Sequence, residues 1–378
     1  MKPSKFNTNT ISKLGFGLMR LPRTSDTSSE INYDTSAKLV DYAMANGINF
    51  FDMAYTYEGN EDFAGAVFSK YPRDSYKLAT KCPPWMVKTP EDFKRIIEEQ
   101  LVRCKTDYFD YYLVHNLAQE MKRAEGNEEY FKNFERNGMY EALQKKKAEG
   151  VVRNVGFSFH GTLELFKRLI DGFNWDFVYI QLNYVDWKAT DAKTQYELAT
   201  ERGIPVIVME PLRGGTLVEL GDEATKLLKK ARPNDSLASW GIRYAASLPN
   251  VISVLSGMNS MEQLKDNIAT IESFTPVTEQ DKTLLDMVTE IYNKSGAISC
   301  TGCEYCVPCP RGVNIPKILS YYNLAMRRGY RIPFDNGYST LSDSEKASNC
   351  NACGLCAEKC PQHLPIADHM NQIDEYSR

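Results

Sequence analysis

Several features that define other classes of protein are missing from this sequence of 378 residues. No apolar run approaches the roughly 20 residues of a membrane-spanning helix. No secretory signal stands out. Neither sign of charge dominates, since the sequence has 45 Lys and Arg and 49 Asp and Glu. The net charge of −4 gives no electrostatic footprint for nucleic acid. We therefore expect a cytoplasmic protein that binds neither membranes nor nucleic acid.

The Gly-x-Gly-x-x-Gly fingerprint of doubly wound dinucleotide-binding folds is also missing. Instead, eight strand-length apolar runs alternate with amphipathic segments over about the first 275 residues. This alternation predicts an α/β fold, a (β/α)8 barrel, with a doubly wound sheet as the alternative. The eight runs are Leu14–Met19, Ile48–Met53, Tyr76–Lys81, Phe109–His115, Arg153–Phe159, Phe177–Asn183, Ile204–Met209 and Val251–Ser256.

The length exceeds the roughly 300 residues of one hydrophobic core, so two domains are expected. We predict a barrel over residues 1–280 and a small, mainly helical domain over 281–378. Thr278 should cap a helix that runs to about Asn293. Residues 119–137, rich in Glu, Lys and Arg, are interpreted as a solvated excursion from the barrel.

Cysteine is concentrated near the C-terminus, where two runs hold eight of the ten cysteines, and each run ends in Cys-Pro. The second run has the spacing C-x2-C-x2-C-x3-C-P, which bacterial ferredoxins use to bind 4Fe–4S clusters. We therefore predict two 4Fe–4S clusters in a ferredoxin-like domain that is ordered largely by its metal. The candidate ligands are Cys300, Cys303, Cys306 and Cys309 in the first run, and Cys350, Cys353, Cys356 and Cys360 in the second.

In two-cluster ferredoxins the fourth cysteine of each run binds the other cluster. That pattern predicts one cluster on the first three cysteines of the first run plus Cys360. It predicts the other on the first three of the second run plus Cys309. Only two residues separate Cys306 from Cys309, so Cys309 is the ligand most open to another assignment. Structural zinc and disulfides are alternatives; we favour iron–sulfur, since zinc leaves the third cysteine of each run and the Cys-Pro endings unexplained.

Catalytic side chains of (β/α)8 enzymes lie at the C-terminal ends of the strands. Asp52, Lys81 and His115 end the second, third and fourth predicted strands, and Tyr57 follows five residues after Asp52. A neighbouring Lys81 cation would lower the pKa of the Tyr57 phenol, so that it can exchange a proton with a carbonyl oxygen. Singly, each is as readily explained as core packing or a structural ion pair; together they predict a catalytic site.

A second tyrosine, Tyr55, competes with Tyr57 for the role of acid. His160 and Trp85, both close to predicted strand ends, are further candidates for substrate or cofactor contact.

The segments GFGLMRLP, FDMAYTYEGNE, LATK, YFDYYLVHN, EGVVRNVGFS, IQLNY, PVIVMEPLRGG and SGMNSMEQLKDN resemble the aldo/keto reductases. The whole chain resembles the branch of that family with a ferredoxin-like extension. The resemblance implies a nicotinamide cofactor, NADP or NAD, bound across the barrel mouth without a Rossmann fold. It also implies reversible reduction of a small carbonyl substrate, with Tyr57 as general acid and base.

The resemblance further implies a set of cofactor contacts along the barrel mouth. By matching motifs, Ser158 and Gln181 would hold the nicotinamide amide, and Met209 stands where an aromatic ring often stacks on the nicotinamide. Pro211 and Leu212 follow Met209 in the same matched segment. The other matched residues are Gly214 and Gly215 near the pyrophosphate, and Ser256, Gln263 and Asn267 near the adenosine. The Lys and Arg that bind a 2′-phosphate are replaced by Gly257 and Gln263, which leaves NADPH or NADH open.

The two halves differ in their electron chemistry, because a nicotinamide transfers a hydride and a 4Fe–4S cluster transfers single electrons. Three functions remain open. The barrel is a carbonyl reductase with structural or sensory clusters; or the clusters exchange electrons with a ferredoxin or flavoprotein partner; or the barrel is a binding scaffold for an electron-transfer module.

Overall fold

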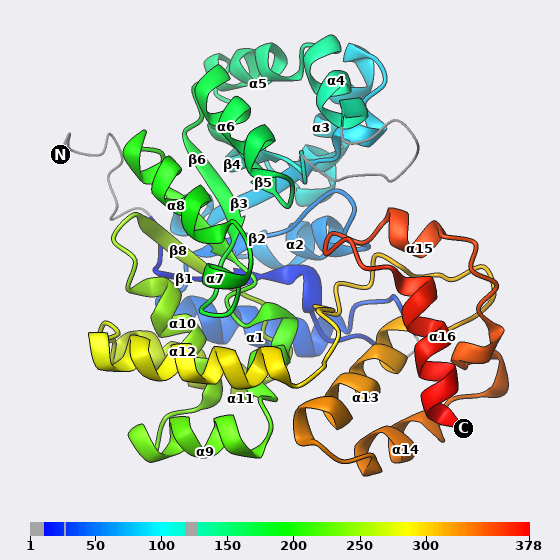
Figure 1. Cartoon of the computed structure of the whole chain (residues 1–378). Helices are drawn as coiled ribbons and strands as arrows, with labels where there is room; N and C mark the ends of the chain where they lie inside the picture. The colour runs from blue at the N-terminus through cyan, green and yellow to red at the C-terminus, as the bar shows by residue number, and fades with distance from the viewer. Residues whose placement is uncertain (1–10, 26–27, 118–127) are drawn as a thin grey trace. The chain divides into compact units, whose positions relative to one another are not determined.

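The computed structural model describes residues 11–25, 28–117 and 128–378 (Figure 1). The chain forms two compact units. The first comprises the described parts of residues 1–118, 128–211 and 242–276, and the second comprises residues 212–241 and 277–378. The division into sequential domains at residue 280 stays a prediction, because units formed by contacts need not follow the order of the chain.

The first unit is built on a closed barrel of parallel strands in the order β1 to β8. Closure occurs where β1 pairs with β8, with Leu14 opposite Val254. Each predicted apolar run overlaps one strand, so the (β/α)8 barrel is confirmed. The strands are β1 Leu14–Gly17, β2 Phe50–Asp52, β3 Lys77–Cys82, β4 Phe109–Val114, β5 Val152–Phe159, β6 Phe177–Gln181, β7 Val206–Met209 and β8 Val251–Ser256.

Helices follow the strands as in other (β/α)8 folds. Those in residues 33–272 are α1 Tyr33–Ala45, α2 Asn60–Phe68, α3 Pro90–Cys104, α4 Glu128–Arg136, α5 Met139–Ala148, α6 Leu163–Gly172, α7 Asp186–Ala189, α8 Ala192–Glu201, α9 Asp222–Ala231, α10 Leu237–Ala246 and α11 Met261–Glu272. Short 3-10 helices are η1 Leu18–Arg20, η2 Arg73–Ser75, η3 Pro84–Met86 and η4 Arg213–Val218.

Helix α4 corrects the interpretation of residues 119–137 as a solvated excursion. Residues 119–127 lie outside the described residues, but Phe131 and Phe134 of α4 are buried, at 2% and 1% exposure. Phenylalanines three residues apart share one face of a helix, and this spacing marks the packed face within an otherwise charged segment.

The second unit is mainly helical, as predicted. Its C-terminal part contains α12 Glu279–Lys294, α13 Ile315–Arg328, α14 Ile332–Tyr338, η5 Asp343–Glu345, η6 Ala347–Asn349, α15 Leu355–Glu358 and α16 Ile366–Ser377. Thr278 caps α12 through a reciprocal pair of hydrogen bonds with Asp281, which confirms the predicted helix start. An apolar core that includes Ile318 and Ile373 lies under both cysteine runs.

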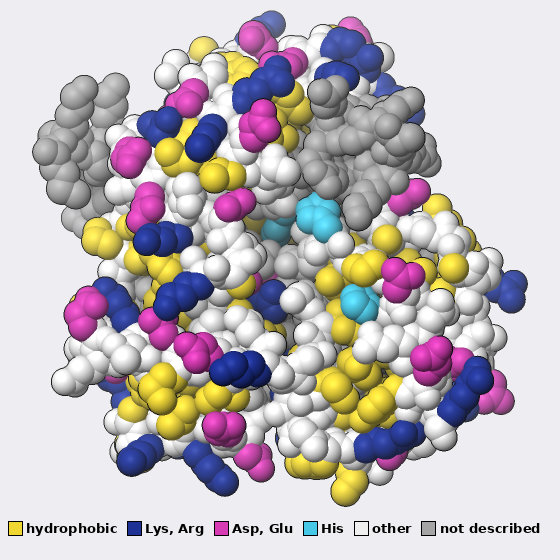
Figure 2. All heavy atoms as spheres, viewed as in Figure 1, with side chains coloured by type: hydrophobic (Ala, Val, Ile, Leu, Met, Phe, Trp, Pro, Cys, Tyr) yellow, Lys and Arg dark blue, Asp and Glu magenta, His cyan; other side chains and the backbone are white. Residues whose placement is uncertain are grey.

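Acidic and basic side chains are intermixed over the face shown in Figure 2. This agrees with the near balance of charges in the sequence. Among the described residues, no helix combines the length and the apolar character needed to cross a bilayer.

Candidate active site and candidate metal centre

The structure brings the four predicted catalytic residues together at the C-terminal ends of β2, β3 and β4. Asp52 is the last residue of β2, Lys81 is the next to last of β3, and His115 directly follows β4. Lys81 Nζ lies 2.7 Å from Asp52 Oδ2 and donates to the Met53 carbonyl at the same distance. It also lies 4.8 Å from the Tyr57 ring centroid, which in turn lies 5.7 Å from that of His115. The predicted cluster therefore exists as a geometric unit.

Burial dominates the electrostatics of this cluster. It raises the pKa of Asp52 and lowers the pKa of Lys81 from their ordinary values, and the ion pair between them opposes both shifts. Burial also lowers the pKa of His115 well below its ordinary value, and the Lys81 and His160 charges lower it further. His115 is therefore a neutral imidazole at neutral pH, which can donate or accept a hydrogen bond without carrying charge.

The competing tyrosine, Tyr55, is engaged elsewhere. Its hydroxyl donates to Glu99 Oε2 at 2.6 Å, and the Arg103 guanidinium lies 4.7 Å from its ring centroid. The loop that carries both tyrosines borders an open cavity, lined by Tyr55, Thr56, Tyr57, Glu58, Gly59, Glu61, Asp62 and Arg103. Two predicted neighbours do reach His115: the Trp85 ring lies 5.5 Å away, and His160 acts on its charge.

Three predicted cofactor residues lie at the ends of successive strands: Ser158 in β5, Gln181 in β6 and Met209 in β7. Ser158 Oγ accepts a hydrogen bond from the Asn116 amide at 2.8 Å, so its own proton is directed to another acceptor. Gln181 Nε2 donates to Asp186 Oδ2 at 2.7 Å, which fixes the orientation of the amide. Asn116 and Asp186 were not predicted from the sequence, because neither belongs to a recognisable motif and only the fold brings each to its partner.

The predicted adenosine residues organise the turn between β8 and α11. Asn267 Nδ2 donates to Ser256 Oγ at 3.1 Å, and both side chains are buried. Gln263 is exposed, and its Oε1 accepts from the Asn259 amide at 2.9 Å. A Cβ built on Gly257 would lie 3.3 Å from Arg20 Cδ, so an arginine side chain from η1 lies against the glycine.

Of the other predicted cofactor residues, Pro211 is buried after β7, and Leu212 and the two pyrophosphate glycines, Gly214 and Gly215, lie in the following loop. Both glycines have positive φ, 68° and 96°. A Cβ on Gly214 would lie only 1.7 Å from the Thr301 carbonyl oxygen, whereas one on Gly215 would meet nothing within 4 Å. Gly214 therefore has a steric role beside the first cysteine run, a contact that no local pattern in the sequence indicates.

We expect Gly214→Ala to destabilise the second unit by at least about 2 kcal/mol more than Gly215→Ala. Both substitutions place Ala at positive φ, which costs about 1–2 kcal/mol, but only Gly214→Ala forces backbone atoms apart. Thermal or denaturant unfolding of the metal-loaded protein measures the difference. Equal destabilisation of the two variants would contradict the contact with Thr301.

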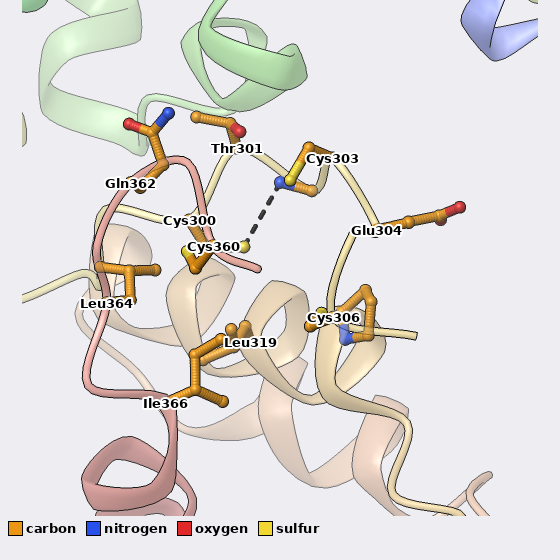
Figure 3. Close-up of a pocket in the computed structure, with 12 residues that line it drawn as sticks. Cys300, Thr301, Cys303, Glu304, Cys306, Leu319, Cys360, Gln362, Leu364 and Ile366 are labelled. Atoms are coloured by element: carbon orange, nitrogen blue, oxygen red, sulfur yellow. Dashed lines mark hydrogen bonds between the residues drawn. The ribbon is translucent and has the colours of Figure 1, made fainter. Parts of the chain in front are cut away.

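Four cysteines line one cavity in the second unit: Cys300, Cys303, Cys306 and Cys360 (Figure 3). Three belong to the first run and the last belongs to the second, which is the combination that the ferredoxin pattern predicts for one cluster. The Gly302 amide donates to Cys300 Sγ at 3.3 Å. Apolar side chains, among them Leu319 and Ile366, also line the cavity.

The backbone repeats itself between the two runs. In the first run Gly302 and Glu304, on either side of the second cysteine, have positive φ of 60° and 66°. In the second run the equivalent residues, Ala352 and Gly354, have φ of 56° and 80°. Both loops therefore turn in the same way around their first three cysteines, although a non-glycine residue bears the left-handed conformation at a different position in each.

The first three cysteines of the second run also lie near one another, since Cys350 and Cys353 both act on the charge of Cys356. Cys309 packs against the same apolar core, and its pairing with the second run stays a prediction. Burial raises the pKa of the Cys306 thiol, and the thiolates of Cys303, Cys300, Cys360 and Cys356 raise it further. A positively charged metal centre would oppose this rise, because it favours the thiolate.

The donor set fits a 4Fe–4S cluster, which is held by four cysteine thiolates. Four cysteines also make up structural zinc sites, and the ferredoxin spacing of the second run favours iron–sulfur. In the part of the chain that the structure describes, no group of three or more His, Cys, Asp or Glu side chains is arranged to hold a metal ion.

Comparisons with known proteins extend these observations. The model of the aldo/keto reductase family matches residues 13–290, and that of the 4Fe-4S dicluster domain matches residues 299–365. L-galactose dehydrogenase of Arabidopsis thaliana is 26% identical over 302 residues, covering 73% of this chain and 89% of the relative. The NADH-specific methylglyoxal reductase of Escherichia coli is 23% identical over 327 residues, covering 74% of this chain and 95% of the relative.

Solved structures show the same barrel. An aldo-keto reductase from Bacillus halodurans in its holo form superposes with a TM-score of 0.57 at 24% identity, covering 74% of this chain and 92% of that one. An aldo/keto reductase from Klebsiella pneumoniae in complex with NADP and acetate gives 0.58 at 19% identity and the same coverage. At these identities the likeness establishes the fold.

Proposed function

This chain belongs to the aldo/keto reductase family, and we propose that its barrel reduces a small carbonyl compound reversibly to an alcohol with NADPH or NADH. We propose further that its C-terminal residues hold two 4Fe–4S clusters. One observation carries the first proposal: the Lys81 ammonium lies against both the Asp52 carboxylate and the Tyr57 ring. A cation held beside a phenol is the arrangement that prepares the phenol for proton transfer.

Each residue has a distinct part in the proton transfer. Tyr57 donates its hydroxyl proton to the carbonyl oxygen during reduction and removes it from the alcohol during oxidation. The Lys81 charge stabilises the phenolate that forms, and Asp52 holds Lys81 in place. His115, neutral because its pKa is lowered by burial, orients the substrate oxygen by a hydrogen bond. A nicotinamide held at the barrel mouth would supply or accept the hydride.

The polar ends of β5 and β6 suit the nicotinamide amide. Ser158 has a hydroxyl proton to donate, because its oxygen already accepts from Asn116, and Gln181 is oriented by Asp186. Met209, half-buried and opposite Gln181 in the sheet, offers a polarisable thioether for packing against a ring. These features support a nicotinamide at the barrel mouth with either dinucleotide.

We expect Arg20 to influence the preference for NADPH over NADH. Its side chain lies against Gly257, where the resemblance predicts the 2′-phosphate of NADPH. Arg20→Ala should weaken NADPH binding about tenfold, the scale of one charge-assisted contact, and leave NADH binding within about twofold. Calorimetry with both dinucleotides measures this, with Arg168→Ala on α6 as a control. Equal weakening of NADPH and NADH would contradict a phosphate contact.

The cysteine cavity supports cluster binding by Cys300, Cys303, Cys306 and Cys360, and by analogy a second cluster on Cys350, Cys353, Cys356 and Cys309. A second function follows from exposure: Cys353 is solvent-exposed and its neighbour Leu355 is 44% exposed. A cluster edge near the surface suits electron exchange with a ferredoxin or flavoprotein, for which the barrel would be a binding scaffold. Thiolate clusters also fit the reducing cytoplasm.

An anaerobic experiment separates these functions. The protein is purified with its clusters, NADH or NADPH is added, and both a carbonyl substrate and the visible absorbance of the clusters are followed. Turnover without bleaching of the clusters supports a carbonyl reductase whose clusters are structural or sensory. Cluster reduction linked to substrate supports electron exchange. Absence of dinucleotide binding and of turnover would contradict the proposed reductase.

A further inference from the structure

Tyr179 is a fully buried tyrosine inside the barrel that the proposed mechanism does not use. It lies in β6, opposite Ser158 of β5 and Ile207 of β7 in the sheet. Its side chain belongs to an apolar cluster that includes Phe50 and Phe177. A hydroxyl group in such surroundings is unfavourable unless a polar group compensates it, so the position of Tyr179 requires a partner.

That partner is the carboxylate of Asp52. Lys81 Nζ donates a hydrogen bond to Asp52 Oδ2 at 2.7 Å, which leaves Asp52 Oδ1 to accept from another donor. Among the described residues, neither Asp52 Oδ1 nor the Tyr179 hydroxyl makes a hydrogen bond of standard geometry. Burial raises the pKa of Asp52, and the Lys81 charge and the hydroxyl of Tyr179 oppose that rise. The two buried atoms are therefore each other's available partners.

Tyr179 remains a donor at any ordinary pH. Burial raises its pKa well above the usual value for tyrosine, and the Asp52 charge raises it further. Lys81 Nζ lies 5.8 Å from the Tyr179 ring centroid and 4.8 Å from that of Tyr57. The same ammonium thus lies near one half-buried phenol and one fully buried phenol, which suits them to different tasks.

We propose that Tyr179 is a positioning residue of this active site, whose hydroxyl proton is donated to Asp52 Oδ1. This donation disperses the carboxylate charge and keeps Asp52 ionised, so that Lys81 stays cationic beside Tyr57. The inference rests on the proposed function, because it concerns the pair that prepares Tyr57. Tyr179 is fully buried and acts on the reaction only through that pair.

Removing the hydroxyl has one predicted direction. The undispersed Asp52 charge either offsets the Lys81 charge more strongly or takes its proton, and both outcomes weaken the positive field at Tyr57. The pKa at which Tyr57 ionises therefore rises. Other titratable groups also shift pKa values in this cluster. The Glu61 charge raises the pKa of Lys81, and the charges of Tyr57 and Tyr111 raise the pKa of Tyr179. The charges of Lys81 and His160 lower the pKa of His115.

The test is Tyr179→Phe in the full-length protein with its clusters. We expect the pH profile for alcohol oxidation to shift to higher pH by at least about 0.5 unit, the scale of a weakened charge interaction. Ionisation of Tyr57 can also be titrated without substrate by the ultraviolet absorbance of its phenolate, after subtraction of the signal of the Tyr57→Phe variant. The midpoint of this titration should shift to higher pH by the same amount. Tyr112→Phe is the matched control, since it removes a buried hydroxyl that donates to Gln100 at 2.6 Å and should leave both titrations unchanged.

The readouts keep the two proposals apart. Absence of carbonyl reduction by the unmodified protein contradicts the proposed function, while the absorbance titration still tests Tyr179. An unshifted titration in Tyr179→Phe, or an equal shift in Tyr112→Phe, overturns the role of Tyr179. If Tyr179→Phe does not fold, Tyr179→Gln keeps a donor and Tyr179→Met removes it. A higher pKa for Tyr57 in the Met variant than in the Gln variant supports the proposal, and equal values overturn it.

Discussion

Tyr57→Phe should lower kcat/KM for carbonyl reduction by about 10²- to 10⁴-fold, the usual contribution of a positioned general acid. The substitution removes one oxygen from a half-buried ring and leaves the ion pair between Lys81 and Asp52 in place, so the loss is chemical and not structural. Steady-state rates with a reactive carbonyl compound and NADPH or NADH measure it. Iron content and thermal unfolding should match those of the unmodified protein.

Tyr55→Phe is the matched control for this prediction. Tyr55 lies in the same loop, but its hydroxyl donates to Glu99, so its removal should change kcat/KM by less than about threefold. Loss of activity in Tyr55→Phe with retention in Tyr57→Phe would reverse the assignment of the acid. Loss of iron in Tyr57→Phe would mean that the substitution disturbs folding.

The barrel and its four central residues could be predicted because they depend on patterns that repeat along the chain. Parallel strands buried on both faces appear as continuous apolar runs, and the ends of those runs identify Asp52, Lys81 and His115 as neighbours. The combination of Cys360 with the first cysteine run followed from a spacing rule, and the cavity contains that combination.

Other features could not be predicted, because they arise between segments with no pattern in common. Nothing near Gly214 indicates that Thr301 approaches it. The charged composition of residues 119–137 concealed the packed face formed by Phe131 and Phe134. In the sequence, Tyr179 is indistinguishable from the other apolar residues of its strand, and only closure of the barrel brings it close to Asp52.

Cys360→Ala should remove one of two clusters and lower the iron content from about eight to about four atoms per chain. Cys360 is buried, at 7% exposure, and lines the cavity with three cysteines of the first run. Its loss therefore affects the cluster of that run and not the cluster of its own run. Iron and sulfide analysis, together with the visible spectrum of the anaerobically purified variant, measures the change.

Double variants decide which run shares a cluster with Cys360. If Cys300 and Cys360 bind the same cluster, Cys300→Ala combined with Cys360→Ala should lose no more iron than either single variant. Cys350→Ala combined with Cys360→Ala should lose both clusters, because the two cysteines then belong to different ones. The opposite pattern would assign each run its own cluster, with Cys360 beside Cys350. The same comparison with Cys309→Ala in place of Cys360→Ala tests the ligand whose spacing departs from the ferredoxin pattern. If Cys309 binds the cluster of the second run, Cys309→Ala should cause no further loss of iron when combined with Cys350→Ala. Combined with Cys300→Ala, it should cause the loss of both clusters.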